Sequence, residues 1–275
     1  MKTYLETKDY FYSQENFKLL YNADMEMLQT SPLPSNPENY YQSESYISHS
    51  DQTSSLFDIA YGLVKRFTLQ RKVALLNRLL PNHGTLLDIG AGTGDFLITA
   101  KLHEWQVTGV EPNPLARKNA LNKGIILNET LNQLPKNKYD IITLWHVLEH
   151  LPNLNKQITD ITELLKNNGF LIVAVPNYKS YDAHYYKEHW AAYDVPRHLW
   201  HFSKTSILKL FHPFGLELFK TKPMWFDSFY VSLLSEKYKT GKIRYITALL
   251  RGFMSNFKGL SSKEYSSHIY ILKKG

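Results

Sequence analysis

The feature that most constrains the fold is an alternation, between residues 84 and 176, of short apolar runs with stretches of helical spacing. This alternation is typical of βαβ units, which build a parallel sheet covered by helices on both faces. It predicts a doubly wound, Rossmann-like α/β fold. The runs that we interpret as strands are "GTLLDIG", "QVTGVEP", "GIILN", "YDIITLWHV" and "FLIVAVP".

Two further strands are expected beyond this region. "LELFKTKPM" follows a helix with Ser203 as its N-cap, and "SSHIYILKK" lies near the end of the chain. The two would pair like a hairpin, so we expect seven mostly parallel strands with an antiparallel last strand. The expected organisation is an N-terminal appendage of loop and short strand (1–55), amphipathic connecting helices (56–80), and a main domain (81–275) with a helical insertion (226–260).

Composition limits the chemistry. The chain has 275 residues, of which 43% are hydrophobic and 21% charged, as in an ordinary globular protein. It has no cysteine, which excludes disulfides, thiolate zinc sites and a cysteine nucleophile. Neither the start, "MKTYLETKDYFYSQENF", nor any other segment offers the apolar stretch of a signal peptide or a membrane span. We therefore expect a cytoplasmic protein.

The net charge of +7 is concentrated in residues 236–275, which contain nine Lys or Arg and two Glu. Such a region suggests acidic partners or a solvated cationic face. The cations are not dense enough for a nucleic-acid patch, so no specific nucleic acid is expected. Within it, "KIRYITALLRGFMSNFKGL" (242–260) could make peripheral membrane contact as an amphipathic helix. Core packing with a cationic outer face is the alternative that we favour.

The segment "LLDIGAGTGDF" (86–96) predicts a ligand-binding loop between a strand and a helix. Glycines allow a sharp turn there and let a ligand approach the backbone. Their G-x-G-x-G spacing differs from the G-x-G-x-x-G of dinucleotide sites. Asp88 would repel a pyrophosphate but favour a cationic, amine-bearing ligand. Glu111, at the end of the next strand, can accept hydrogen bonds from both hydroxyls of a ribose.

Together with "VTGVEPNP" and "YDIITLWHVLEHLPN", this loop resembles the class I S-adenosylmethionine-dependent methyltransferases, over residues 80–220 and the last strand. The resemblance is to the bacterial type 11/23-like group, which is related to the ubiquinone-biosynthesis O-methyltransferases. It implies S-adenosyl-L-methionine as cofactor and S-adenosyl-L-homocysteine as product. The residues that it places at the cofactor are Asp88 near the amino group, Gly90, Ala91, Gly92 and Gly94 along the methionine and ribose, Glu111 at the ribose hydroxyls, Pro112, Asn113, Thr130 and Leu131 around the adenine, and Trp145 and His146 beside the sulfonium.

The segment "LWHVLEHLPN" (144–153) contains the H-x-x-E-H spacing of some zinc proteases. Such a zinc site needs both histidines on one helical face, whereas here His146 is expected at a strand end and Glu149 and His150 in the following turn. Relatives that methylate ubiquinone precursors have "E-x-L-E-H" at this place, with a metal implied in some, and His146 replaces their first acid. We therefore expect no metal. Glu149 and His150 could be catalytic or could hold the turn.

The segment "YDAHYYKEHWAAYDVPRHLWHF" (181–202) is rich in histidine and aromatic residues and follows the fifth strand, where methyltransferases of this fold shape the acceptor pocket. A self-packed aromatic loop is the alternative. Transfer to a hydroxyl also needs a base, for which histidine is suited near neutral pH. The candidate catalytic residues are His198, with Asp194 or Tyr193 as orienting partner, and His146. The candidate substrate-binding residues are Arg197, for an anionic group, His150, His201, Tyr41 and Tyr46.

The leading hypothesis is methyl transfer to an oxygen of a small-molecule or glycan-type, sugar-derived acceptor. The alternative is a cofactor-binding regulatory or scaffold protein without turnover. It is suggested by the N-terminus. Several bacterial relatives associated with surface-polysaccharide and sugar modification carry a small zinc module with paired cysteines there, whereas residues 19–34 of this chain have none. A nicotinamide-dependent enzyme is disfavoured by the glycine spacing.

Overall fold

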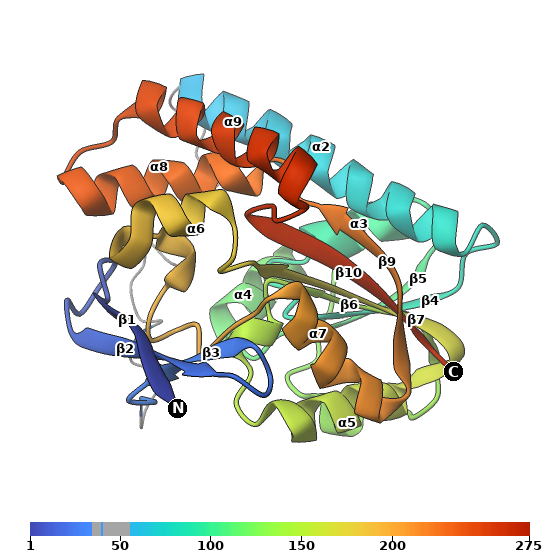
Figure 1. The fold of residues 1–275 in the computed structure, drawn as a ribbon. Coiled ribbons are helices and arrows are strands. Elements are labelled where there is room, and N and C mark those ends of the chain that lie inside the picture. Colours follow the sequence, from blue (N-terminus) through green and yellow to red (C-terminus); the bar gives the residue numbers. More distant parts are fainter. Residues whose placement is uncertain (35–39, 41–55) are drawn as a thin grey trace. The chain divides into compact units, whose positions relative to one another are not determined.

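The computed structural model describes residues 1–34, 40 and 56–275, so Tyr41 and Tyr46 lie outside the described residues. Its main feature is the expected α/β arrangement, with a six-stranded, mostly parallel sheet that has one antiparallel strand (Figure 1). The strands, in spatial order, are β5 (Gln106–Val110), β4 (Thr85–Ile89), β6 (Tyr139–Trp145), β7 (Leu165–Pro176), β10 (Ser267–Lys274) and β9 (Leu216–Pro223).

Strands β5, β4 and β6 are parallel and end in register. Ile89, the last residue of β4, pairs with Val110 of β5 and with Leu144 of β6. Leu86 and Leu87 are completely buried, as expected for a strand covered on both faces. The chain passes from β4 to β5 and then back across β4 to β6, so the strand order reverses beside β4. Ligands of open α/β sheets bind at such a reversal, outside the carboxyl ends of the strands.

The sheet has one strand fewer than the seven expected. The segment 124–128, which was expected to be a strand, makes a single bridge, from Asn128 to Val110. Gly124, with φ of 83°, turns the chain out of α4 (Pro114–Asn122), and Ile126 points into solvent. The apolar run is therefore a turn that touches the sheet edge, and its composition alone was misleading.

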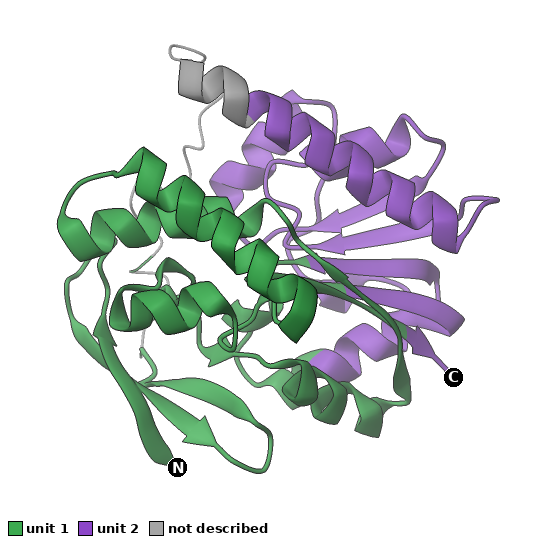
Figure 2. Ribbon diagram, turned by 45° about the horizontal axis from the view of Figure 1, so that its top comes forward, with its two compact units in different colours: residues 1–42, 145–157, 173–272 green, residues 43–144, 158–172, 273–275 purple. Residues whose placement is uncertain are grey.

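Contacts group the chain into two compact units (Figure 2). Unit 2 comprises residues 43–144, 158–172 and 273–275 and holds the glycine loop. The expected connecting region is a single helix, α2 (Leu56–Leu79), that ends before Pro81. Lys65 of α2 and Lys123, just after α4, both form ion pairs with Asp95, the first residue of α3 (Asp95–Lys101). These ion pairs connect α2, α3 and α4 around the loop.

Unit 1 comprises residues 1–42, 145–157 and 173–272 and contains a second sheet. Its strands, in order, are β1 (Lys2–Lys8), β2 (Asn16–Asn22), β3 (Met27–Ser31) and β8 (Trp200–His201), all antiparallel. Leu28 of β3 pairs with His201 of β8. The N-terminal strands are therefore grouped with the segment that follows β7, and the expected boundaries at residues 55 and 80 do not separate the two units.

The remaining helices follow the expected pattern. Ser203 caps α7 (Lys204–Phe211) and exchanges hydrogen bonds with Ser206, as expected for an N-cap. The expected helical insertion is present as two helices. No helix within the described ranges combines the length and the hydropathy needed to cross a bilayer. The helices not yet bounded are α5 (Leu154–Leu164), α6 (Tyr181–Tyr186), α8 (Asp227–Thr240) and α9 (Tyr245–Ser262).

Candidate cofactor and acceptor sites

The loop after β4 adopts a backbone geometry that glycine favours. Gly90, Gly92 and Gly94 have φ of 70°, 54° and 78°, in the left-handed region that other residues rarely adopt. The N–H groups of Gly90 and Ala91 both donate to the carbonyl of Val110, at 2.8 and 3.0 Å, which holds the loop against the end of β5. A Cβ added at Gly92 would meet no atom of the described residues within 4 Å. Those residues therefore leave the space beside this glycine open to a ligand.

Glu111 lies against the same loop. Its Oε2 accepts a hydrogen bond from the N–H of Gly92 at 2.9 Å, and its Oε1 accepts one from the N–H of Asn113 at 2.9 Å. Two backbone donors thus orient the carboxylate directly after β5. Each carboxylate oxygen can accept more than one hydrogen bond, so Glu111 keeps the capacity to bind hydroxyl groups.

Asp88 is buried near the end of β4. It is 3% exposed and accepts a hydrogen bond from Thr143 Oγ1 at 2.6 Å. Burial raises the pKa of Asp88 to about 7, against the opposing effects of the Thr143 hydrogen bond and the charge of Lys72, and the charge of Glu111 adds to the rise. A bound cation would favour the charged form of this carboxyl group.

The turn expected to border the adenine adjoins Glu111. The N–H of Glu111 donates to the carbonyl of Asn128 at 2.9 Å, and the N–H of Asn128 donates to the carbonyl of Gly109 at 2.9 Å. Thr130 is exposed, and Leu131 begins a short 3-10 turn. Two other expected residues follow Glu111 directly: Pro112, which is exposed, and Asn113, whose side chain caps α4.

In unit 1, His146 comes directly after Trp145, the last residue of β6, while Glu149 and His150 lie in a 3-10 turn. This confirms the expected strand end and turn, so no helical face carries both histidines. His146 has φ of 57°, which is uncommon for a residue other than glycine. Its Nε2 lies 3.0 Å from Asp227 Oδ2, and its Nδ1 lies 3.3 Å from Glu149 Oε1.

These two carboxylates determine the charge of His146. Burial alone would lower the pKa of His146, but the hydrogen bonds and charges of Asp227 and Glu149 outweigh burial and raise that pKa to about 10. The ring is therefore an imidazolium at neutral pH. It can donate protons but cannot accept one, which disfavours His146 as a general base.

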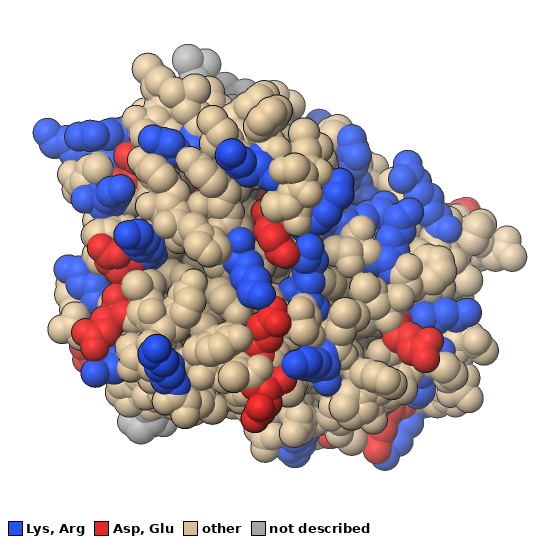
Figure 3. Space-filling model, viewed as in Figure 1, with Lys and Arg blue, Asp and Glu red and all other residues tan. Residues whose placement is uncertain are grey.

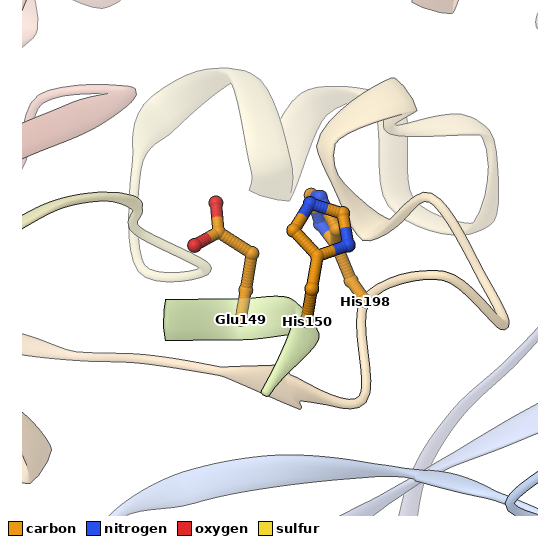
Figure 4. Close-up of side chains that lie close together, drawn as sticks. All are labelled: Glu149, His150 and His198. Atoms are coloured by element: carbon orange, nitrogen blue, oxygen red, sulfur yellow. The ribbon is translucent and has the colours of Figure 1, made fainter. Parts of the chain in front are cut away.

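A second group of side chains could together bind a metal ion: Glu149, His150 and His198 (Figure 4). Each offers one possible metal-ligand atom, and these three atoms lie within 4.8 Å of one another. The Nδ1 of His150 donates to the carbonyl of Arg197 at 3.0 Å, and the Nδ1 of His198 donates to the carbonyl of Ala192 at 2.9 Å. A carbonyl can only accept, so each ring carries a proton on Nδ1, and in the neutral form of the ring Nε2 is the acceptor, as in histidines that bind metals. These residues could hold a metal ion, and our expectation that none is needed stays a prediction.

The charges in this cluster are set by burial and by neighbouring groups. Burial, together with the nearby His198, lowers the pKa of His150 to about 4, so His150 is neutral at pH 7. Burial would raise the pKa of Glu149, but the hydrogen bond and the charge of His146 lower it. Glu149 is 1% exposed, and its Oε2 has no hydrogen-bond partner among the described residues. The cluster therefore contains a buried carboxylate beside a neutral imidazole.

Arg197 is buried between two aspartates. Its Nη2 donates to Asp9 Oδ1 at 2.9 Å and to Asp194 Oδ1 at 2.6 Å. Burial alone would lower the pKa of the guanidinium, but Asp194 and Asp9 raise it, so the charge is kept. We expected Arg197 to bind an anionic group of the substrate, but its donors serve these two carboxylates. A buried carboxylate left without a cation would be strongly destabilising.

His201 and Tyr193, also expected at the site, are buried. Thr30 Oγ1 donates its single proton to the carbonyl of His198 at 2.6 Å, so it accepts from His201 Nε2 at 3.1 Å. Burial lowers the pKa of His201 well below its usual value and raises the pKa of Tyr193 well above its usual value. The Tyr193 ring packs edge-on against the His201 ring, with centroids 5.4 Å apart.

His198 is oriented by a group that we did not expect. Its Nδ1 bonds the Ala192 carbonyl, and Asp194 Oδ2 lies 4.0 Å from its Nε2, beyond hydrogen-bond distance. The sequence analysis also missed Asp227, Asp9 and Thr30, which contact His146, Arg197 and His198 respectively. No local motif marks these three residues, because each is far along the chain from its partner.

Comparison with known proteins identifies the family. A family model of a methyltransferase domain matches residues 64–221, which is more than half of the chain. The chain belongs to this methyltransferase domain family, whose cofactor is S-adenosylmethionine.

One curated relative is a ubiquinone biosynthesis O-methyltransferase from Shewanella halifaxensis. The two sequences are 29% identical over 102 residues, which cover 34% of this chain and 43% of that protein. A second, from Photobacterium profundum, is 32% identical over 102 residues, with the same coverage of 34% and 43%. The match thus spans less than half the length of either relative.

Among solved structures, the fold is similar to that of geranyl diphosphate C-methyltransferase from Streptomyces coelicolor. The TM-score is 0.57 at 12% identity, and the match covers 89% of this chain and 100% of that chain. At this identity the likeness concerns the fold.

Proposed function

We propose that this chain transfers the methyl group of S-adenosylmethionine to an oxygen atom of a small-molecule or sugar-derived acceptor. The methyltransferase family match supports the reaction. The oxygen acceptor is supported by the curated relatives, which are O-methyltransferases.

The observation that carries the cofactor half is the hydrogen bond of Glu111 to the Gly92 N–H, at a glycine whose Cβ position has no atom of the described residues within 4 Å. A ribose fits this site, because its two hydroxyls can donate to the carboxylate. A pyrophosphate would be repelled by Glu111 and Asp88. The methionine amino group, being cationic, would be attracted by Asp88.

When bound, the cofactor supplies an electrophilic methyl group on a sulfonium that is a good leaving group. The residues of the chain must then hold the acceptor oxygen in line, exclude water and remove a proton. The acceptor oxygen forms a bond to the methyl carbon, and the bonding electron pair of the methyl–sulfur bond returns to sulfur. The hydroxyl proton passes to a base on the protein.

His198 is the base that the geometry favours. The Ala192 carbonyl fixes the proton of His198 on Nδ1, which leaves Nε2 as the acceptor. Asp194 Oδ2, at 4.0 Å from Nε2, would stabilise the ring once it has taken the proton. His146 is already protonated, and a pKa of about 4 makes His150 a weak base.

Calorimetry with S-adenosylhomocysteine tests the cofactor half. The wild type should bind it, and Glu111→Ala should weaken binding by about tenfold or more, because hydrogen bonds to a charged acceptor are lost. The control Glu104→Ala removes an exposed carboxylate from the same unit and should leave the affinity unchanged. Absence of binding by the wild type, or equal binding by Glu111→Ala, would contradict the proposal.

Incubation with labelled cofactor and fractionated cell extract should identify the acceptor. His198→Gln should then lower kcat by about 10²- to 10⁴-fold and leave S-adenosylhomocysteine binding intact. His184→Gln, at an exposed histidine of the same segment, is the matched control. Full turnover by His198→Gln would exclude His198 as the base, and binding without any transfer would favour the regulatory alternative.

A further inference from the structure

Helix α9 is packed with its small side chains inwards. Ala248, Gly252, Ser255 and Gly259, spaced by three or four residues, are buried. A Cβ added at Gly252 would lie 2.6 Å from the ring of Phe229 on α8, and one added at Gly259 would lie 2.6 Å from the ring of Tyr265. The inner face of α9 therefore depends on close approach and has no room for large side chains.

The large apolar side chains of α9 lie on the opposite face. They recur at the same three- and four-residue spacing, which on an α-helix makes a continuous stripe. Ile246 is 78% exposed and Phe253 is 67% exposed. This exposure contradicts the core packing that we favoured from the sequence. The members of the stripe are Ile246, Leu249, Leu250, Phe253, Met254, Phe257 and Leu260, and all are exposed.

The charge of the chain segment that carries this stripe has a single sign. Residues 237–263 contain seven Lys or Arg and no Asp or Glu. Lys242, Arg244 and Lys258 are exposed, and Arg251 stacks on the Tyr185 ring at 3.9 Å. Several Lys and Arg side chains are visible over α8 and α9 at the upper left of Figure 3. A helix that carries a stripe of large apolar side chains and whose own charged residues are all cations is typical of helices that lie in the interface of an anionic bilayer.

We infer that α9 docks the protein on the surface of an anionic lipid bilayer, with its apolar stripe at the headgroup–acyl boundary and its cations at the lipid headgroups. The 18 residues of α9 correspond to a length of about 27 Å, enough for side chains along the whole helix to enter the interface together.

The charge distribution favours a bilayer over a second copy of the chain. Pairing of two α9 stripes would bring the cations of both copies together, and like charges at short range oppose association. A bilayer with anionic headgroups supplies the opposite charge and an apolar layer at the same surface.

Vesicle flotation tests this inference with the full chain. The protein should float with phosphatidylcholine vesicles that contain phosphatidylglycerol and should bind vesicles of phosphatidylcholine alone at least about tenfold more weakly, with binding reduced by salt. Phe253→Ser combined with Phe257→Ser should reduce the affinity about tenfold or more. Lys242→Gln combined with Lys258→Gln should also reduce the affinity about tenfold or more, because each cation raises the affinity for anionic vesicles about fivefold.

The matched control combines Leu121→Ser and Phe219→Ser. Both residues lie outside α9, and the side chain of each is 58% exposed. This variant should float like the wild type. Equal binding by the Phe253/Phe257 variant, or no binding to anionic vesicles, would overturn the inference. So would a stable dimer in sedimentation that the Phe253/Phe257 variant abolishes, because a second copy would then cover the stripe. Lipid binding needs no turnover, so its failure is distinguishable from failure of the proposed methyl transfer.

Discussion

The Nε2 of His146 lies 3.0 Å from Asp227 Oδ2, and this contact, together with Glu149, keeps His146 a cation near neutral pH. The pairing could not be inferred from the H-x-x-E-H motif, in which the histidine would be neutral in order to bind a metal.

An NMR titration of the His146 ring should show a midpoint of about 10 instead of the ordinary 6.5. A pKa that is raised by folding stabilises the protein fully below pH 6.5, and this stabilisation is lost as the pH rises through about 10. Asp227→Asn should lower the midpoint, because it removes one of the two carboxylates. The His146 signal is assigned by its absence in His146→Gln. A midpoint below 7 in the wild type would refute the charge assignment.

Asp88 should have the opposite effect on stability from that of an ordinary aspartate. Its pKa of about 7 in the folded chain, against 3.8 in the unfolded chain, means that the contribution of Asp88 to stability is most favourable below pH 4 and declines as the pH rises to about 7. The difference corresponds to roughly 4 kcal/mol. Asp88→Asn lacks this dependence. Urea denaturation should therefore show that the free energy of unfolding of the variant, relative to that of the wild type, is higher at pH 8 than at pH 4. Parallel pH profiles would show that Asp88 ionises normally.

Arg197 should be important for stability. Arg197→Met leaves Asp9 and Asp194 without their cation and should lower the free energy of unfolding by about 3–5 kcal/mol. The control is Lys18→Met, which breaks the exposed ion pair with Glu6 and should cost less than about 1 kcal/mol. Urea denaturation measures both. If instead Arg197→Met is as stable as the control and only raises KM for the acceptor, then Arg197 binds substrate.

Methyl transfer should not require a metal ion. The imidazolium of His146 already supplies a positive charge to Glu149, and a divalent ion bound to Glu149, His150 and His198 would compete with it. Turnover should therefore survive dialysis against EDTA, with elemental analysis as the readout for bound metal. A stoichiometric metal that is lost in Glu149→Gln, together with turnover that returns on adding the metal, would contradict this prediction.

The geometry of the glycine loop was predictable from sequence because its parts are local. Asp88, Gly92 and Glu111 sit at the ends of adjacent strands, and the alternation of strand and helix predicts that adjacency. The segment 124–128 was wrongly predicted as a strand, because an apolar run does not distinguish a strand from a partly buried turn.

The residues around Arg197 and His198 depend on distant partners. Asp9 and Arg197 are 188 residues apart, and no pattern in either segment indicates that they meet. In α9, the spacing predicts an amphipathic helix in either orientation. The buried face is the one that carries Gly252 and Gly259, because these glycines pack closely against Phe229 and Tyr265. Both contacts are with residues outside α9, so the sequence of the helix alone does not indicate them.

The pairing of β3 with β8 has a consequence for synthesis of the chain. Thr30 and His198 are 168 residues apart, so at ribosomal rates of roughly 5–20 residues per second the partner of β3 emerges about 10 to 30 s later. During that interval the open edge of β3 presents unpaired backbone groups to any other strand nearby. Strands β1, β2 and β3 are therefore exposed to mispairing until β8 has emerged, and the strands that complete the sheet beside the glycine loop emerge later still.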